Sequence, residues 1–117
     1  MGRQMAFWKY DDGVELNAHD VYEKACLNEE TVIGLSMLPV GDILKKVREV
    51  FSDYDMLDEY NFESGKGSFT IYTSEQMVMF DCSWSMLTEE LNKLIDIMLA
   101  FGCPFYDPQI DTRFDGK

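Results

Sequence analysis

The sequence predicts an α+β two-layer sandwich, in which a mainly antiparallel sheet carries two helices on one face. Two segments, residues 42–51 and 88–101, each carry a single apolar stripe at helical spacing. Between them lie three short stretches with the alternation typical of strands, separated by turn residues. Packing both helices on one face of the sheet is the simplest way to bury both stripes. A ferredoxin-like variant with an additional N-terminal helical arm fits the same order of elements.

The length and composition indicate a single domain over residues 1–117. A hydrophobic fraction of 46% is ordinary for a globular protein, so the high charge does not indicate disorder. A chain of this size buries about two thirds of its unfolded surface and needs no metal or disulfide to fold. The cysteines are odd in number and form no C-x-x-C pair, so we expect buried thiols at Cys26, Cys82 and Cys103.

We expect a cytoplasmic protein. No apolar run approaches the roughly 20 residues of a membrane span. The first eight residues are too short and too soon followed by charge for a secretory signal. Ala6 stands where a myristoylation signal would have Ser or Thr, so Gly2 is not expected to be acylated.

The first thirty residues predict a strand, a turn and a short helix. Residues 5–10 are apolar and aromatic enough for a strand, and residues 11–13 (DDG) are typical of a turn. Asn17 is expected to cap the helix, with Asp20 in its first turn. The apolar side of this helix comprises Val21, Tyr22, Ala25 and Cys26.

Residues 31–37 (TVIGLSM) are rich in β-forming side chains, and we predict a buried strand there. A second helix is expected to begin at Pro39 and Asp42, because a missing N–H and a negative charge both suit a first helical turn. Its apolar stripe comprises Ile43, Leu44, Val47, Val50 and Phe51.

Three further strands are expected at residues 60–64, 68–73 and 76–83. The short separations between them match tight hairpins, and in the middle strand Phe69 and Ile71 alternate with polar neighbours. Residues 77–80 are apolar throughout, which predicts a central strand that is covered on both faces.

The last helix is expected to be capped by Thr88, with Glu89 and Glu90 complementing the helix dipole. Gly102 ends it, and Pro104 prevents its continuation. Its core face comprises Leu91, Leu94, Ile95, Met98 and Phe101. The tail, residues 105–114, predicts an edge strand interrupted at Pro108.

The charge of the chain restricts its partners. With 22 acidic and 10 basic residues, the net charge is −12, which repels DNA, RNA and anionic lipid and attracts a basic protein.

The acidic residues are densest in residues 53–63 (DYDMLDEYNFE), which contain no Lys or Arg. The candidate protein-binding residues are Asp53, Tyr54, Asp55, Asp58, Glu59, Tyr60 and Glu63. In this interpretation Tyr54, Tyr60 and Phe62 are anchors and the carboxylates steer the partner. The alternative is a solvated loop, with Tyr60 and Phe62 turned into the core.

No pattern predicts a metal, cofactor or catalytic site. His19 and Glu23 have the i, i+4 spacing of metal ligands, but His19 is the sole histidine and no second pair accompanies it. Residues 53–64 lack the glycine of a calcium loop, and Ser64 stands where its bidentate Glu would be. Nucleophilic catalysis would depend on that same histidine for any of Cys82, Cys103, Ser83 or Ser85. The chain contains no G-x-S-x-G, Walker or G-x-G-x-x-G motif, so we expect no enzymatic activity and no cofactor.

The basic residues are scattered, which disfavours nucleic-acid binding. Their one cluster comprises Lys45, Lys46 and Arg48 on the second predicted helix. This cluster is interpreted as a solvated face, and it leaves open a homodimer in which the helix pairs with acidic residues of a second copy.

The C-terminal segment reads G-C-P-F-Y-D-P-Q from Gly102 to Gln109, followed by T-R-F from Thr112 to Phe114. This ending resembles that of small acidic bacterial proteins, a group that includes immunity proteins, which neutralise a toxin made by the same or a neighbouring cell. The resemblance covers only this segment and implies no catalytic residues.

The sequence therefore predicts a binding protein without catalysis, most concretely an immunity protein that covers a basic toxin domain. The alternative is a self-associating structural or regulatory subunit that uses an exposed sheet edge or the Lys45, Lys46 and Arg48 face. An enzyme of another type would require a deep pocket that brings carboxylates together with His19 or a cysteine.

Overall fold

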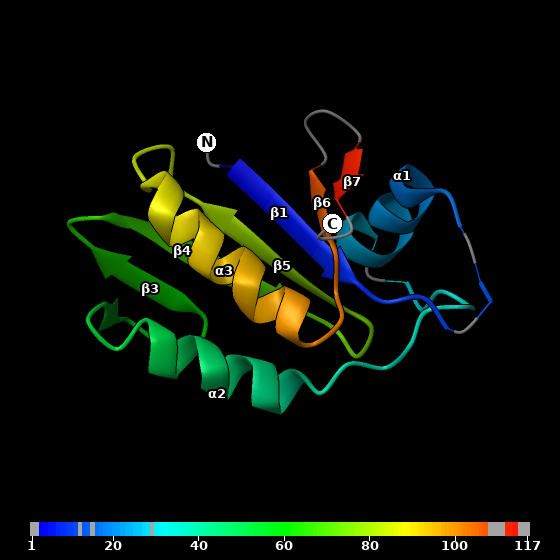
Figure 1. Cartoon of the computed structure of the whole chain (residues 1–117), viewed down its shortest axis with the longest axis horizontal. Coiled ribbons are helices and arrows are strands. Elements are labelled where there is room, and N and C mark those ends of the chain that lie inside the picture. The colour runs from blue at the N-terminus through cyan, green and yellow to red at the C-terminus, as the bar shows by residue number, and fades with distance from the viewer. Residues whose placement is uncertain (1–2, 12, 15, 29, 108–111, 115–117) are drawn as a thin grey trace.

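The structure is a computed structural model, and it describes residues 3–11, 13–14, 16–28, 30–107 and 112–114. In this part of the chain, seven strands form one antiparallel sheet in the order β2-β3-β4-β5-β1-β6-β7. Figure 1 shows helices α2 and α3 side by side over one face of this sheet. The α+β sandwich expected from the sequence is thereby confirmed.

The elements follow the chain in this order: β1 (Arg3–Trp8), α1 (Ala18–Val21), the π-helical segment η1 (Tyr22–Leu27), α2 (Val40–Val50), β2 (Asp55–Met56), β3 (Asn61–Ser64), β4 (Gly67–Thr73), β5 (Met77–Cys82), α3 (Thr88–Ala100), β6 (Phe105–Asp107) and β7 (Thr112–Phe114).

The main core lies between the sheet and the two long helices. Alternation along the strands directs one set of side chains to this face, which comprises Met5, Phe7, Phe69, Ile71, Val78 and Phe80. The helices meet them with the stripes expected from the sequence, since Ile43, Val47, Phe51, Leu91, Leu94 and Met98 are buried and Leu44, Val50, Ile95 and Phe101 are partly buried. Helix α3 also buries Ile97 and Glu90, which the sequence did not indicate.

A second, smaller core lies on the opposite face of the sheet. The side chain of Asn17 caps α1 as predicted, because its Oδ1 accepts a hydrogen bond from the Asp20 N–H at 3.1 Å. The continuous α1–η1 segment then packs Val21, Tyr22, Ala25 and Cys26 against Ala6, Trp8, Met77, Met79 and Tyr106. Strand β5 is therefore covered on both faces at residues 77–80, which confirms the prediction for a central strand.

The predicted strand at residues 31–37 is wrong. This segment is a loop in which Ile33 is 94% exposed and Gly34 adopts a φ of +101°. Only Leu35 forms a bridge, to Tyr10. Strand β1 is already paired with β5 on one side and β6 on the other, so no sheet edge is available to residues 31–37 there. The side chain of Gln76 instead binds the backbone of Val32 through two hydrogen bonds of 2.9 Å.

Smaller differences occur at the ends of elements. Thr88 is the first residue of α3 rather than its cap, and Leu87 occupies the cap position without a side-chain hydrogen bond. Strand β2 was not expected. The tail supplies the predicted edge strand as β7, but it also contributes β6, which lies between β1 and β7. Gly102 ends α3 as predicted, with a φ of +79°. Pro108, which was expected to interrupt the tail, and Asp12 of the predicted turn lie outside the described residues.

Cys26, Cys82 and Cys103 are all buried thiols. Burial raises the pKa of Cys26 to about 12, so almost none of it is thiolate at neutral pH. We therefore expect alkylation of the native protein at about pH 8 to be slow and to become fast in denaturant. The thiols that remain free after each alkylation time are counted with a chromogenic disulfide reagent. A cysteine that reacts in the native protein as fast as the free amino acid would contradict the described burial.

Candidate protein-binding surface

The acidic segment, defined as residues 53–63, runs from the end of α2 through β2 into β3. Its carboxylates are all exposed: Asp53, Asp55, Asp58, Glu59 and Glu63. A cation pairs with one of them, because Lys66 Nζ lies 2.9 Å from Asp53 Oδ2. Both partners of this ion pair are about half exposed, so it adds little to stability. The segment thus presents negative charge to solvent, as expected from the sequence.

The aromatic residues of the acidic segment divide between core and surface. Tyr54 is 6% exposed, and its ring contacts Phe51 and Phe69 at centroid distances of 5.1 and 5.8 Å. Phe62 is also buried and stacks on Phe69 at 4.9 Å. The expectation that Tyr54 and Phe62 are exposed anchors is therefore corrected, because both rings complete the main core. Tyr60 is 40% exposed and remains available to a partner.

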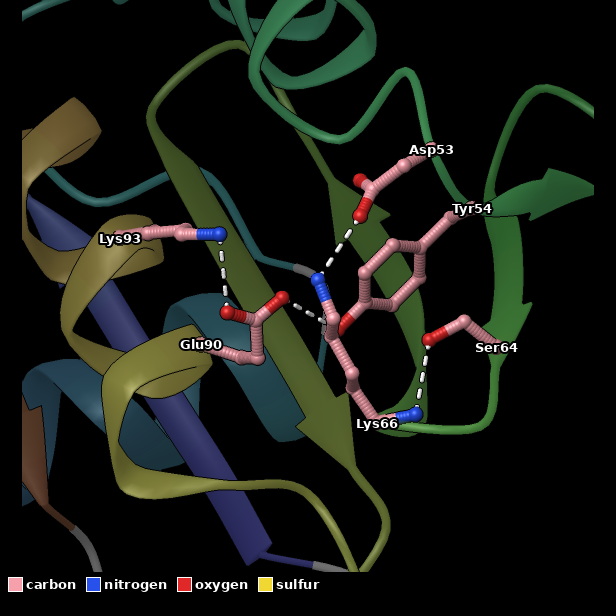
Figure 2. A network of polar contacts seen from close by, with 6 residues as sticks. All are labelled: Asp53, Tyr54, Ser64, Lys66, Glu90 and Lys93. Carbon is pink, nitrogen blue, oxygen red and sulfur yellow. Dashed lines mark hydrogen bonds and ion pairs between the residues drawn. The ribbon is translucent and has the colours of Figure 1, made fainter.

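A buried polar network fixes the start of the acidic segment against α3 (Figure 2). Glu90 is 3% exposed, and its Oε1 accepts a hydrogen bond from the Tyr54 hydroxyl at 3.0 Å. Its Oε2 lies 2.9 Å from Lys93 Nζ, one helical turn further along α3. The contact with Lys93 lowers the pKa of Glu90, so the carboxylate is charged at neutral pH. Burial, with the hydrogen bond to Glu90, raises the pKa of Tyr54 to about 12, so the hydroxyl stays a donor.

The hairpin between β3 and β4 lies beside this network (Figure 2). The Lys66 N–H donates to Ser64 Oγ at 3.0 Å, while the Lys66 side chain reaches Asp53. The start of the acidic segment thus makes two polar contacts, one from Tyr54 to α3 and one from Asp53 to the β3–β4 hairpin.

Asp58 shapes the turn inside the acidic segment. Its Oδ1 accepts hydrogen bonds from the N–H groups of Tyr60 at 2.8 Å and Asn61 at 3.0 Å. The Asn61 side-chain amide also donates to this carboxylate. These bonds lower the pKa of Asp58. Asp58 is therefore a structural acceptor as well as a surface charge, whereas Asp55, Glu59 and Glu63 have no such role in the described part of the chain.

The other groups considered from the sequence lie apart from the acidic segment. His19 of α1 pairs with Glu23 of η1 at 2.7 Å, and both side chains are about half exposed. The Nδ1 of His19 lies 3.4 Å from the Tyr106 hydroxyl. The described residues contain no cluster of side chains that could hold a metal ion. Ser83 Oγ and Ser85 Oγ lie 3.1 Å apart after β5. The basic cluster, Lys45, Lys46 and Arg48, is exposed on α2.

A cavity of about 390 Å³ lies between α1 and the loop at residues 30–33. Its lining includes Asp20, Lys24 and Glu30 but neither His19 nor a cysteine. This cavity therefore lacks the combination of groups that the enzyme hypothesis requires.

No protein-family model matches the sequence, and no curated protein matches it either. Within the described residues, none of the helices combines the length and the apolar composition required to cross a membrane.

Proposed function

We propose that this chain is a small acidic binding protein of the cytoplasm that covers a basic protein partner, most concretely an immunity protein that neutralises a basic toxin domain. The observation that carries the proposal is the acidic segment, in which five exposed carboxylates lie within eleven residues and no Lys or Arg intervenes. Buried thiols at all three cysteines fit a reducing compartment.

Two physical effects support binding at this surface. A net charge of −12 attracts a basic protein over distances of about one Debye length, roughly 10 Å at 0.1 M salt, and such steering raises association rates by about 10–10³. The hydrogen bond of Tyr54 with Glu90 fixes the start of the segment, and the bonds of the Asp58 carboxylate with the N–H groups of Tyr60 and Asn61 fix its turn. A preorganised surface loses less conformational entropy on binding than a flexible loop does.

We expect the double variant Asp55→Asn/Glu59→Gln to associate several-fold more slowly with a basic partner, because it removes two exposed charges that have no structural role. Biolayer interferometry against a panel of purified basic toxin nuclease domains, at about 0.1 M and about 1 M ionic strength, measures the effect. The difference from the unmodified chain is expected to disappear at the higher salt concentration.

The matched control is Glu75→Gln/Asp96→Asn. It removes the same net charge from two exposed positions, one in the β4–β5 turn and one on α3, outside the acidic segment. Equal slowing by both double variants would show that only bulk charge matters. Association rates that do not change with salt would contradict the electrostatic basis of the proposal. A dimer whose formation is abolished by Asp55→Asn/Glu59→Gln would favour the self-associating subunit instead.

A further inference from the structure

Within the part of the chain that the structure describes, one part of the sheet has no covering layer. The α1–η1 segment covers β1, β6 and the beginning of β5, through Ala6, Trp8, Met77 and Met79. Figure 1 shows α1 on the β6 side of the sheet and β3 on the other side. The open face, as we name it, consists of the side chains of β3, β4 and the end of β5 that point away from α2 and α3: Asn61, Glu63, Ser68, Thr70, Tyr72 and Asp81.

The strand register places polar side chains in a row across the open face. Asn61 is opposite Thr70, Thr70 is opposite Asp81, and Asp81 is opposite Gln4. Neighbours in such a row have Cβ atoms about 4.5–5.5 Å apart, so their side chains form one continuous surface. Thr70 Oγ1 donates to Asn61 Oδ1 at 2.7 Å, which fixes the orientation of both.

The open face contains a depression. This depression of about 270 Å³ is lined mostly by polar residues, Asn61, Glu63, Ser68, Thr70 and Asp81, together with Leu57, Phe62 and Phe69. Leu57 is 66% exposed. Tyr72, the next residue after Thr70 on this face of β4, is 48% exposed. Gln4 is the last residue of this polar row on the side of η1, and its Oε1 accepts a hydrogen bond from the Tyr22 hydroxyl.

The charge of this face has one sign. Strands β3, β4 and β5 contain no Lys or Arg. Glu63 and Asp81 line the depression. A further carboxylate, Asp55 on β2, is opposite Glu63 in the strand register. The ion pairs formed by the described side chains, His19–Glu23, Lys66–Asp53 and Lys93–Glu90, do not include Asp81. Aspartate is depleted in strands, and a partly buried carboxylate without a cation is unfavourable. A cation bound in the depression would complement the negative charges of Asp81 and Glu63.

We infer that the open face receives an arginine-containing segment of the partner protein, with the guanidinium in the depression between Asp81 and Glu63. A guanidinium carries five N–H donors and no acceptor, which matches two carboxylates and two hydroxyls. Tyr72 offers an aromatic face to the same group or to its neighbour. This inference rests on the proposed function and adds the place of contact, with the acidic segment as the rim of the interface.

The test is an NMR titration of the whole ¹⁵N-labelled chain with a hexa-arginine peptide, and with hexa-citrulline as the neutral probe. We expect the amide signals of Thr70, Tyr72 and Asp81 to shift with the arginine peptide alone. Asp81→Asn is expected to weaken the affinity about tenfold, as for loss of one charge-assisted contact. The matched control Asp96→Asn removes the same charge from α3, and its affinity is expected to stay unchanged. Tyr72→Ala is a second variant, because it weakens binding without altering charge.

The outcomes separate this inference from the proposed function. Shifts confined to Asp58, Glu59 and Tyr60 would overturn the inference and leave the proposed function standing. Equal weakening by Asp81→Asn and Asp96→Asn would overturn it as well, because binding would then depend on net charge alone. Broadening at Thr70 and Tyr72 without any peptide would indicate that a second copy covers the face, and it would also overturn the inference. Binding of neither peptide at either surface would contradict both.

Discussion

Replacing Gly67 with alanine is expected to lower the free energy of unfolding by about 2–5 kcal/mol. Gly67 begins β4 with a φ of +134°, a conformation that residues with a Cβ atom rarely adopt. A Cβ atom at this position would lie 2.5 Å from the Cα and 2.7 Å from the Cβ of Met86. Met86 cannot easily move, because its side chain is buried in the main core and its N–H donates to Ser83 O at 3.1 Å. Urea denaturation followed by circular dichroism measures the loss.

The other glycine of the same hairpin, Gly65, provides a matched control. A Cβ atom at Gly65 would meet nothing within 4 Å, and Gly65 is not among the described glycines with positive φ. Gly65→Ala is therefore expected to leave stability unchanged or to raise it slightly, through a smaller entropy of the unfolded chain. Equal destabilisation by the two substitutions would show that the contact with Met86 is not what restricts residue 67 to glycine.

The long helices and the central strands could be predicted because their signals are local. The stripe from Ile43 to Phe51 and the glycine at residue 102 specify α2 and the end of α3 without reference to any neighbour. Residues 31–37 show the limit of this approach. Their side chains favour a strand, but strand formation needs a free partner edge, and β1 has none.

The charge of the candidate site could be predicted from the sequence, but the buried contacts that hold it against the core could not. Exposure of the carboxylates at residues 53–63 follows from the cost of burying charge. Glu90 is different: the sequence assigns it to the first turn of the last helix without indicating its burial, and the structure buries it against Tyr54. Only the packing of α3 on the sheet brings these two residues, 36 positions apart in the chain, together. The open face is equally invisible in the sequence, because it depends on where α1 and η1 end.

Replacing Lys93 with methionine is expected to lower the free energy of unfolding by about 2–4 kcal/mol at neutral pH. The substitution leaves the Glu90 carboxylate buried with the Tyr54 hydroxyl but without its cation. The expected loss is smaller than for a fully buried ion pair, because Lys93 is 41% exposed. Methionine retains a long side chain near the Phe51 ring, which Lys93 Nζ approaches at 5.9 Å, so lost packing contributes little. Urea denaturation at about pH 7 and about pH 4 measures the effect.

The pH dependence distinguishes this mechanism from a loss of packing. In the unmodified chain Lys93 holds the pKa of Glu90 below its ordinary value of 4.5. The ion pair therefore stabilises the fold fully at pH values above 4.5. This contribution is lost as the pH falls through the lowered pKa of Glu90. Without Lys93, burial favours the neutral acid, and the variant recovers stability as Glu90 takes up a proton. The difference between the two proteins is therefore expected to shrink from about pH 7 to about pH 4. A difference in the free energy of unfolding that stays constant with pH would indicate lost packing instead. The control is Lys66→Met, which removes the cation of the exposed pair with Asp53 and is expected to change stability little at either pH.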